Sequence, residues 1–212
     1  MPNFIMNIRR ITKPGQEGAL VAAAIETLNG ANTPGNVSID ISTAVMSDPA
    51  VTNALQFDTL SDVEQLHDAA LGNPESELIQ RFYATNALAS KVTTTLYRII
   101  DPVELGPDDQ IGMLKYMSRT LLMAKRGEAS NVLNVVREVR SNRPGRKPMI
   151  NMAVLGNPDL VRIVRWYRSL EELEMEQARM RENKEYKTAL GQLAGLTTMV
   201  RQTLARAVHF KQ

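Results

Sequence analysis

Asn7 and Arg9 are the first residues of the sequence whose types and spacing suggest chemistry. They alternate, so a β-strand would place both side chains on one face together with Ile5 and Ile11. A partly buried guanidinium stays charged and offers a fork of donors, which favours an anionic or enolate-like ligand. The spacing therefore predicts that both residues line any ligand pocket. Placement at the rim of a sheet is the alternative.

His67 lies in the stretch DVEQLHDAAL, where helical spacing puts Val63, Leu66 and Ala70 close to one stripe. His67 falls at the edge of that stripe. Histidine is the side chain that exchanges protons most readily near neutral pH, so it could act there as an acid or a base. The pattern indicates a histidine that borders the pocket, or one that is only solvated.

Arg98 and Arg206 occur in two copies of one short pattern, T-L-x-R, within TTLYRII and QTLARAV. A pair of equivalent guanidinium groups could hold a carboxylate between them. Two arginines on a solvent-facing strand would give the same pattern. We therefore keep both residues as ligand-binding candidates, and we identify no catalytic residue from the sequence.

The composition excludes several classes of site. The 212 residues include two histidines and no cysteine, so disulfides and thiolate chemistry are excluded and a metal site is not expected. No phosphate-binding glycine loop, dinucleotide fingerprint or serine-hydrolase elbow is present, and no cofactor is predicted. The stretch REVRSNRPGRK carries five basic residues but no aromatic one, so it indicates a solvated loop or a phosphate contact, not nucleic-acid binding.

The N-terminal stretch MPNFIMNIRRI has no apolar core of signal-peptide length, and no apolar run approaches the roughly 18 residues of a membrane span. Together with the lack of cysteine, these features predict a cytoplasmic protein with no membrane partner.

The sequence contains an internal repeat. AVMSDP begins at Ala44 and AVLGNP at Ala153, and the offset of 109 becomes 110 where Phe57 aligns with Tyr167 and Thr59 with Ser169. Each copy predicts a hairpin that turns at Asp48-Pro49 or Asn157-Pro158 and then enters a helix. Thr59 and Ser169 precede an acidic residue by three positions, which is the spacing of a capping box.

Each half therefore predicts the order β-α-β-β-α-β, with an additional helical stretch, and Gly15 and Gly127 fall in equivalent breaks. This order is that of a ferredoxin-like unit, whose sheet has one face left to bury. We divide the chain into a first repeat at residues 1–101, a connector at 102–115 and a second repeat at 116–212. The expected fold is α+β: two tandem ferredoxin-like repeats with antiparallel sheets that close one barrel.

The stretches NIRRITKPGQEGALVAA and WYRSLEELE resemble the antibiotic-biosynthesis-monooxygenase-like and NIPSNAP-like proteins of the dimeric α+β barrel superfamily. The resemblance implies a pseudo-dimeric barrel, in which the second repeat replaces a second subunit, so that a homodimer would use outer surfaces. It also implies a ligand pocket beside the first strand.

Two functions follow from these features. The first is a monooxygenase-like enzyme that acts on an organic substrate without a cofactor. The second is a non-catalytic ligand-binding or structural module with the same barrel.

Overall fold

The computed structural model describes residues 2–41, 49–155 and 157–211, so Asp48 of the first predicted turn lies outside the described residues. The element order is the predicted one, with two helices between the third and fourth strands of each half. The first half contains β1 (Phe4–Thr12), α1 (Glu17–Gly30), β2 (Gly35–Asp40), β3 (Ala50–Phe57), α2 (Leu60–Gly72), α3 (Glu77–Ala87) and β4 (Ala89–Asp101). After a 3-10 turn at Ile111–Met113, the second half contains β5 (Tyr116–Ala124), α4 (Ala129–Ser141), β6 (Met149–Ala153), β7 (Leu160–Tyr167), α5 (Leu170–Glu182), α6 (Lys184–Leu196) and β8 (Thr197–Lys211).

Hydrogen bonds join the described strands in the order β1-β3-β2-β8-β5-β7-β6-β4, which closes into a barrel. The orders β4-β1-β3-β2 and β8-β5-β7-β6 within it are the same permutation of the two halves, as expected for a duplicated ferredoxin-like unit. Both hairpins, β2–β3 and β6–β7, are antiparallel. The predicted fold class, a tandem-repeat α+β barrel, is confirmed.

The chain forms two compact units, which exchange the ends of two strands. Unit 1 contains Met1–Arg98 and Ala205–Gln212, and unit 2 contains Ile99–Leu204. The long strands β4 and β8 therefore each begin in one unit and end in the other. The last part of β8 pairs with β2 and completes the sheet of unit 1.

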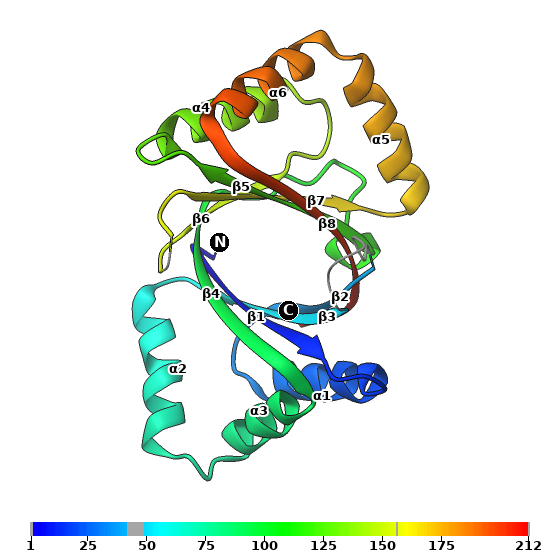
Figure 1. Cartoon of the computed structure of the whole chain (residues 1–212). Helices are drawn as coiled ribbons and strands as arrows, with labels where there is room; N and C mark the ends of the chain where they lie inside the picture. Colours follow the sequence, from blue (N-terminus) through cyan, green and yellow to red (C-terminus); the bar gives the residue numbers. More distant parts are fainter. Residues whose placement is uncertain (1, 42–48, 156, 212) are drawn as a thin grey trace. The chain divides into compact units, whose positions relative to one another are not determined.

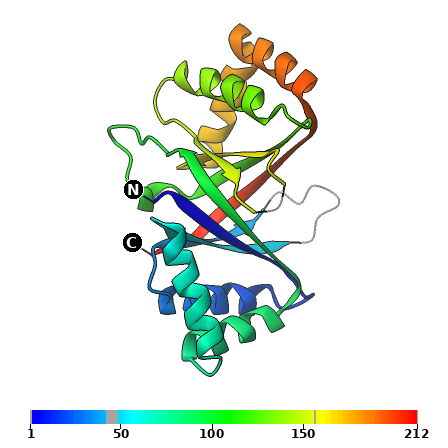
Figure 2. The same ribbon diagram turned by 90° about the vertical axis from the view of Figure 1, so that its left-hand side faces the viewer.

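The sheet of unit 1 carries its helices on one face. Alternate residues of β1 and β3 point to this face, and Asn53 there donates a hydrogen bond of 2.8 Å from Nδ2 to the carbonyl oxygen of Ala24 in α1. In both views α1 and α3 lie side by side under the strands, whereas α2 projects away from them (Figures 1 and 2). Of the described residues in α2, none is fully buried, which fits a helix that contacts the sheet at only one end.

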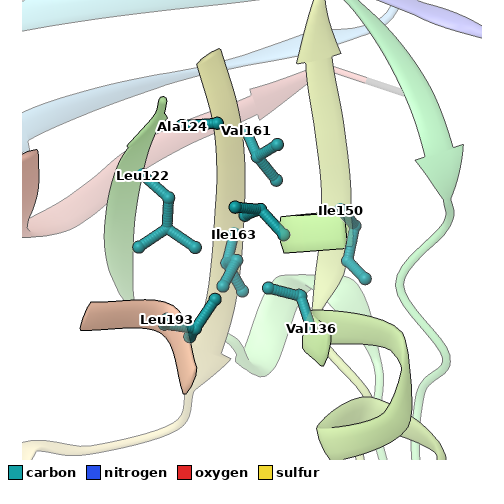
Figure 3. Close-up of a cluster of buried hydrophobic side chains, with 8 residues drawn as sticks. Leu122, Ala124, Val136, Ile150, Val161, Ile163 and Leu193 are labelled. Carbon is teal, nitrogen blue, oxygen red and sulfur yellow. The ribbon is translucent and has the colours of Figure 1, made fainter. Parts of the chain in front are cut away.

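Unit 2 has an apolar core between its sheet and the helices α4 and α6. Leu122, Val161 and Ile163 alternate along β5 and β7, so they face the same side of the sheet. Figure 3 shows Val136 of α4 and Leu193 of α6 packed over them. The buried cluster comprises Leu122, Ala124, Val132, Val136, Ile150, Val161, Ile163 and Leu193.

The capping box expected from the sequence is complete at the start of α2, whereas at α5 only the serine side of the box is present. Thr59 Oγ1 accepts a hydrogen bond of 3.2 Å from the backbone N–H of Asp62, and the Asp62 carboxylate accepts one of 2.8 Å from the N–H of Thr59. Ser169 caps α5 through a hydrogen bond of 3.1 Å from the N–H of Glu172, and the Glu172 carboxylate accepts one from the N–H of Arg168. These local contacts fix where the chain leaves β3 and β7.

Substituting Thr59→Ala should lower the free energy of unfolding by about 1 kcal/mol, because it removes an acceptor from the first turn of α2. Ser76→Ala is the matched control, since Ser76 also precedes a helix but its side chain makes no capping hydrogen bond. Urea unfolding of the two variants and the parent measures both effects. Equal losses in the two variants would contradict this role of Thr59.

The equivalent glycines of the two repeats adopt the same backbone conformation. Gly15 has φ 76° and Gly127 has φ 83°, both in the left-handed region that favours glycine. Each ends the turn that leads from the first strand of its repeat into α1 or α4. The match confirms that the two breaks are equivalent.

The basic stretch from Arg137 to Lys147 contacts acidic and carbonyl groups of unit 2 instead of lying free in solvent. Arg137 pairs with Asp101 at 2.8 Å, and Arg140 with Glu104 at 2.8 Å. Lys147 also pairs with Glu104, at 3.0 Å. This stretch begins in the last turns of α4, and its charges are paired with acidic groups of its own unit.

Asp109 in the connector is the centre of a further ionic network, here called the connector clamp (Asp109, Arg146 and Arg168). Arg146 donates to both Asp109 oxygens, at 2.7 and 2.5 Å, and Arg168 donates at 2.9 Å. The backbone N–H of Gly106 adds a hydrogen bond of 2.9 Å. Since the Asp109 side chain is only 4% exposed, the clamp holds the connector firmly against the loop before β6 and the start of α5.

Candidate functional site

A cluster of polar side chains lies on the helix-bearing face of unit 2, at the end of the sheet nearest α5. Tyr167 is 1% exposed, and its phenol oxygen lies 3.4 Å from Ser118 Oγ. The same phenol donates a hydrogen bond of 3.3 Å to Glu176 Oε1 of α5. The strand register explains the contact between Tyr167 and Ser118. Ser118 of β5 lies opposite Arg165 of β7, and Arg165 precedes Tyr167 by two positions, so all three side chains share one face.

Two arginines complete this cluster. Arg143 donates to both oxygens of Glu176, one of the hydrogen bonds measuring 2.6 Å. Arg165 lies 3.8 Å from Glu176 Oε1, and its Nε is buried with no hydrogen-bond partner among the described residues. Two guanidinium groups against one carboxylate leave the cluster with one positive charge in excess. We call Ser118, Arg143, Arg165, Tyr167 and Glu176 the phenol–guanidinium cluster.

Burial raises the pKa of Tyr167 to about 12, and the negative charge of Glu176 adds to the effect. The phenol therefore stays protonated at neutral pH and acts as a hydrogen-bond donor. A neutral donor beside an excess cation is an arrangement that stabilises an oxyanion. The cluster can thus hold a carboxylate, phenolate or enolate oxygen.

The internal repeat shows that the fold does not require these polar groups. The alignment that matches Tyr167 with Phe57 places Leu55 at the position of Arg165 and Leu66 at that of Glu176. Met6 takes the place of Ser118, since each faces the corresponding residue of the neighbouring strand. Unit 1 thus builds the same corner from apolar side chains. The cluster is therefore specific to the second repeat.

The candidates predicted on the first strand lie elsewhere, on the face of the unit 1 sheet opposite α1 and α3. Asn7 is 8% exposed, and its Oδ1 has no hydrogen-bond partner among the described residues. Asn36 and Thr52, on the same face, also have buried polar atoms without a partner in the described part of the chain. Arg9 forms an ion pair of 3.1 Å with Asp40 of β2. Asn7 and Arg9 do share one face, as their spacing predicts.

The structure does not bring the other predicted residues to that face. His67 is exposed on α2, on the helix side of unit 1. Arg98 and Arg206 are exposed on β4 and β8, with β1, β3 and β2 between those strands. Arg98 lies over the ring of Phe4, with 5.5 Å between its guanidinium carbon and the ring centroid. The predicted arginine pair is therefore two separate residues at opposite edges of one sheet.

Each unit has a cavity among its described residues. One of about 310 Å³ lies in unit 1 and is lined by apolar residues of the sheet and α1 together with Thr12 and Glu17. The other, of about 500 Å³, lies between α4 and α6 in unit 2 and is lined mainly by Asn131, Asn134, Gln192 and Leu196. The phenol–guanidinium cluster lines neither cavity.

Comparison with known proteins identifies the fold. No family model matches the chain, and no curated protein matches it. A candidate monooxygenase from Fusobacterium nucleatum superposes with a TM-score of 0.72 at 8% identity, over 100% of this chain and 95% of the other. An anthrone oxidase-like protein gives 0.69 at 15% identity, over 99% and 92%.

A ferredoxin-fold protein from Listeria monocytogenes related to antibiotic biosynthesis monooxygenases gives a TM-score of 0.51 at 9% identity, over 99% and 97% of the two chains. These solved structures cover both repeats. The chain therefore has the antibiotic-biosynthesis-monooxygenase-like fold in its tandem-repeat form, as its sequence motifs suggest.

Proposed function

We propose that this chain is a cofactor-independent oxygenase-like enzyme that binds a small organic ketone and stabilises its enolate at the phenol–guanidinium cluster of unit 2. The observation that carries the proposal is the excess positive charge beside a buried, protonated Tyr167. Its likeness in fold to an anthrone oxidase-like protein supports an electron-rich ketone as the substrate class. The lack of cysteine supports a cytoplasmic location.

The proposed reaction is R₂CH₂ + O₂ → R₂C=O + H₂O, where the methylene is activated by a neighbouring aryl ketone. A methylene proton passes to Glu176, and the resulting enolate oxygen is held by the Tyr167 phenol and the Arg165 guanidinium. The enolate carbon donates electrons to O₂ and forms a C–O bond, giving a peroxide. The peroxide takes back the proton held by Glu176. Loss of the second methylene proton and cleavage of the O–O bond then release water and leave the ketone, so one oxygen atom of O₂ enters each product.

α5 is held to unit 2 by the ion pairs of Glu172 and Glu176, and it buries little apolar surface. None of its residues is fully buried, although Glu172 and Glu176 turn toward the sheet. Outward movement of α5 therefore costs little apolar burial. We infer that an aromatic ligand enters between α5 and β7 and covers the side of the cluster that faces solvent.

Anthrone is the probe for this proposal, with oxygen uptake and quinone absorbance as the measurements. Tyr167→Phe and Arg165→Leu copy the residues that unit 1 has at these positions, so both should fold. Each should lower kcat/KM by about 10- to 150-fold, the range for losing a hydrogen bond to a charged group. Tyr83→Phe is the matched control, because that phenol is 58% exposed on α3 of unit 1.

The outcomes separate the two functions. Binding of anthrone without oxygen uptake would leave only a non-catalytic ligand-binding module. Arg9→Ala provides the comparison with the first-strand assignment. Loss of activity in Arg9→Ala, with Arg165→Leu unaffected, would move the site to the opposite sheet face of unit 1 and contradict the cluster assignment.

A further inference from the structure

Arg10 is a cation enclosed in the helix layer of unit 1, away from the phenol–guanidinium cluster. It lies on β1 and is 0% exposed. Its Nε donates a hydrogen bond of 2.7 Å to Asn86 Oδ1 of α3, and its Nη1 donates one of 2.6 Å to Asn53 Oδ1 of β3. The ring of Phe82 lies 5.1 Å from the guanidinium carbon.

No anionic group of the described chain neutralises this cation. Its two hydrogen-bond partners are neutral amides, and Nη2 is buried without a partner among the described residues. The acidic side chains of the packed helices point elsewhere: Glu17 and Glu26 of α1 are exposed, and Glu77 of α3 pairs with Arg81. Burial lowers the pKa of Arg10 to about 10, so the group remains charged at neutral pH.

The second repeat shows that unit 1 does not need a charge here to fold. Leu122 and Ile163 occupy the positions of Arg10 and Asn53, because Leu122 faces Val161 as Arg10 faces Val51. Both belong to the apolar cluster drawn in Figure 3. An isolated buried charge is among the most unfavourable groups that a protein interior can contain. Because only one of the two repeats has this charge, we expect a group of opposite charge to bind beside it.

We propose that Arg10 Nη2 binds a small monovalent anion of chloride size in the helix layer of unit 1. One donor group with one positive charge matches a monovalent ion, whereas a divalent oxyanion would leave a buried negative charge. Arg10 is 0% exposed and does not line the neighbouring cavity of about 310 Å³, so only a small ion could reach Nη2, and the side chains around it must shift to admit one. Thr12 and Val51, which do line that cavity, adjoin Arg10 on its own strand and on the paired one, and they mark the route of entry.

Bromide is the probe for this site. Crystals of the parent soaked in sodium bromide should show an anomalous peak within hydrogen-bond distance of Arg10 Nη2. In solution, the melting temperature should rise saturably in sodium chloride or bromide, by roughly 5–10 °C at a hundredfold excess over Kd. Sodium sulfate at the same ionic strength should give a smaller, non-saturating change.

The double substitution Arg10→Leu/Asn53→Ile copies unit 2 and should abolish both the peak and the halide dependence. An ordered water at Nη2 with no anomalous signal would overturn the proposal. So would an equal response to chloride and sulfate, or a halide effect that persists in the double variant. If the double variant fails to fold, the bromide soak of the parent decides alone.

Discussion

Asp109→Ala is expected to lower the free energy of unfolding by about 3–5 kcal/mol, the usual loss when one partner of a buried ion pair is removed. The substitution would leave Arg146, whose side chain is 10% exposed, without its two strongest acceptor atoms. It would also remove the carboxylate that pairs with Arg168, leaving that arginine only the backbone oxygen of Asp108 in the connector. Urea unfolding at neutral pH measures the loss.

Asp108→Ala is the matched control, because Asp108 is exposed and contributes only its backbone oxygen to Arg168. This variant should stay within about 0.5 kcal/mol of the parent. Similar losses in the two variants would show that the clamp contributes nothing beyond a surface ion pair.

The clamp also predicts a pH dependence. Hydrogen bonds from Arg146, and then from the Gly106 N–H and Arg168, outweigh burial and hold the pKa of Asp109 well below its usual range. A carboxyl with a lowered native pKa contributes stability that is complete above its unfolded pKa of about 4 and is lost as the pH falls toward the native value. Asp109→Asn should therefore show a flatter loss of stability below pH 4 than the parent.

Gly35→Ala should destabilise the protein by about 3 kcal/mol or prevent its accumulation. A Cβ at this position would overlap the backbone carbonyl oxygen of Ala54 and touch Leu28. The new methyl group would meet backbone on one side and a buried helix residue on the other, so no flexible group can move to make room for it. Thermal and urea unfolding would measure the effect, and a melting temperature equal to that of the parent would contradict this assignment.

Gly191→Ala is the opposite case and serves as the control for glycine replacement. Gly191 lies inside α6, and nothing comes within 4 Å of a Cβ placed there. Alanine should raise the free energy of unfolding by about 0.5–1 kcal/mol, because it restricts the unfolded chain and favours the helix. The helix passes through Gly191, and the break between α5 and α6 lies at Asn183.

Local patterns account for the part of the fold that could be predicted. The capping residues Thr59 and Ser169 and the glycines Gly15 and Gly127 act within a few positions of themselves, so their spacing is visible in the sequence. The repeat then supplied the topology, since two copies of one element order constrain each other. No such pattern showed which face of β1 meets the helices, and that face holds Arg10, not Asn7 or Arg9.

The candidate site depends on contacts between distant residues, which is why spacing did not reveal it. Arg143 and Glu176 are 33 positions apart, and each lies in a charged stretch that resembles a solvated surface. The sequence does contain one indication of the candidate site, which is a difference between the two repeats. Arg165 and Glu176 replace Leu55 and Leu66, and a charge that replaces leucine at an inward position indicates a site more sharply than the residue type alone.

The exchange of strand ends also sets a time scale for synthesis in the cell. β2 ends at Asp40, but its outer partner in β8 begins at Ala205, about 165 residues later. At translation rates of roughly 5–20 residues per second, the hydrogen-bonding edge of β2 stays open on the ribosome for about 10 to 30 s. Such an edge can pair with another nascent chain, and chaperone dependence during translation is thus a cost of building one sheet from both ends of the chain.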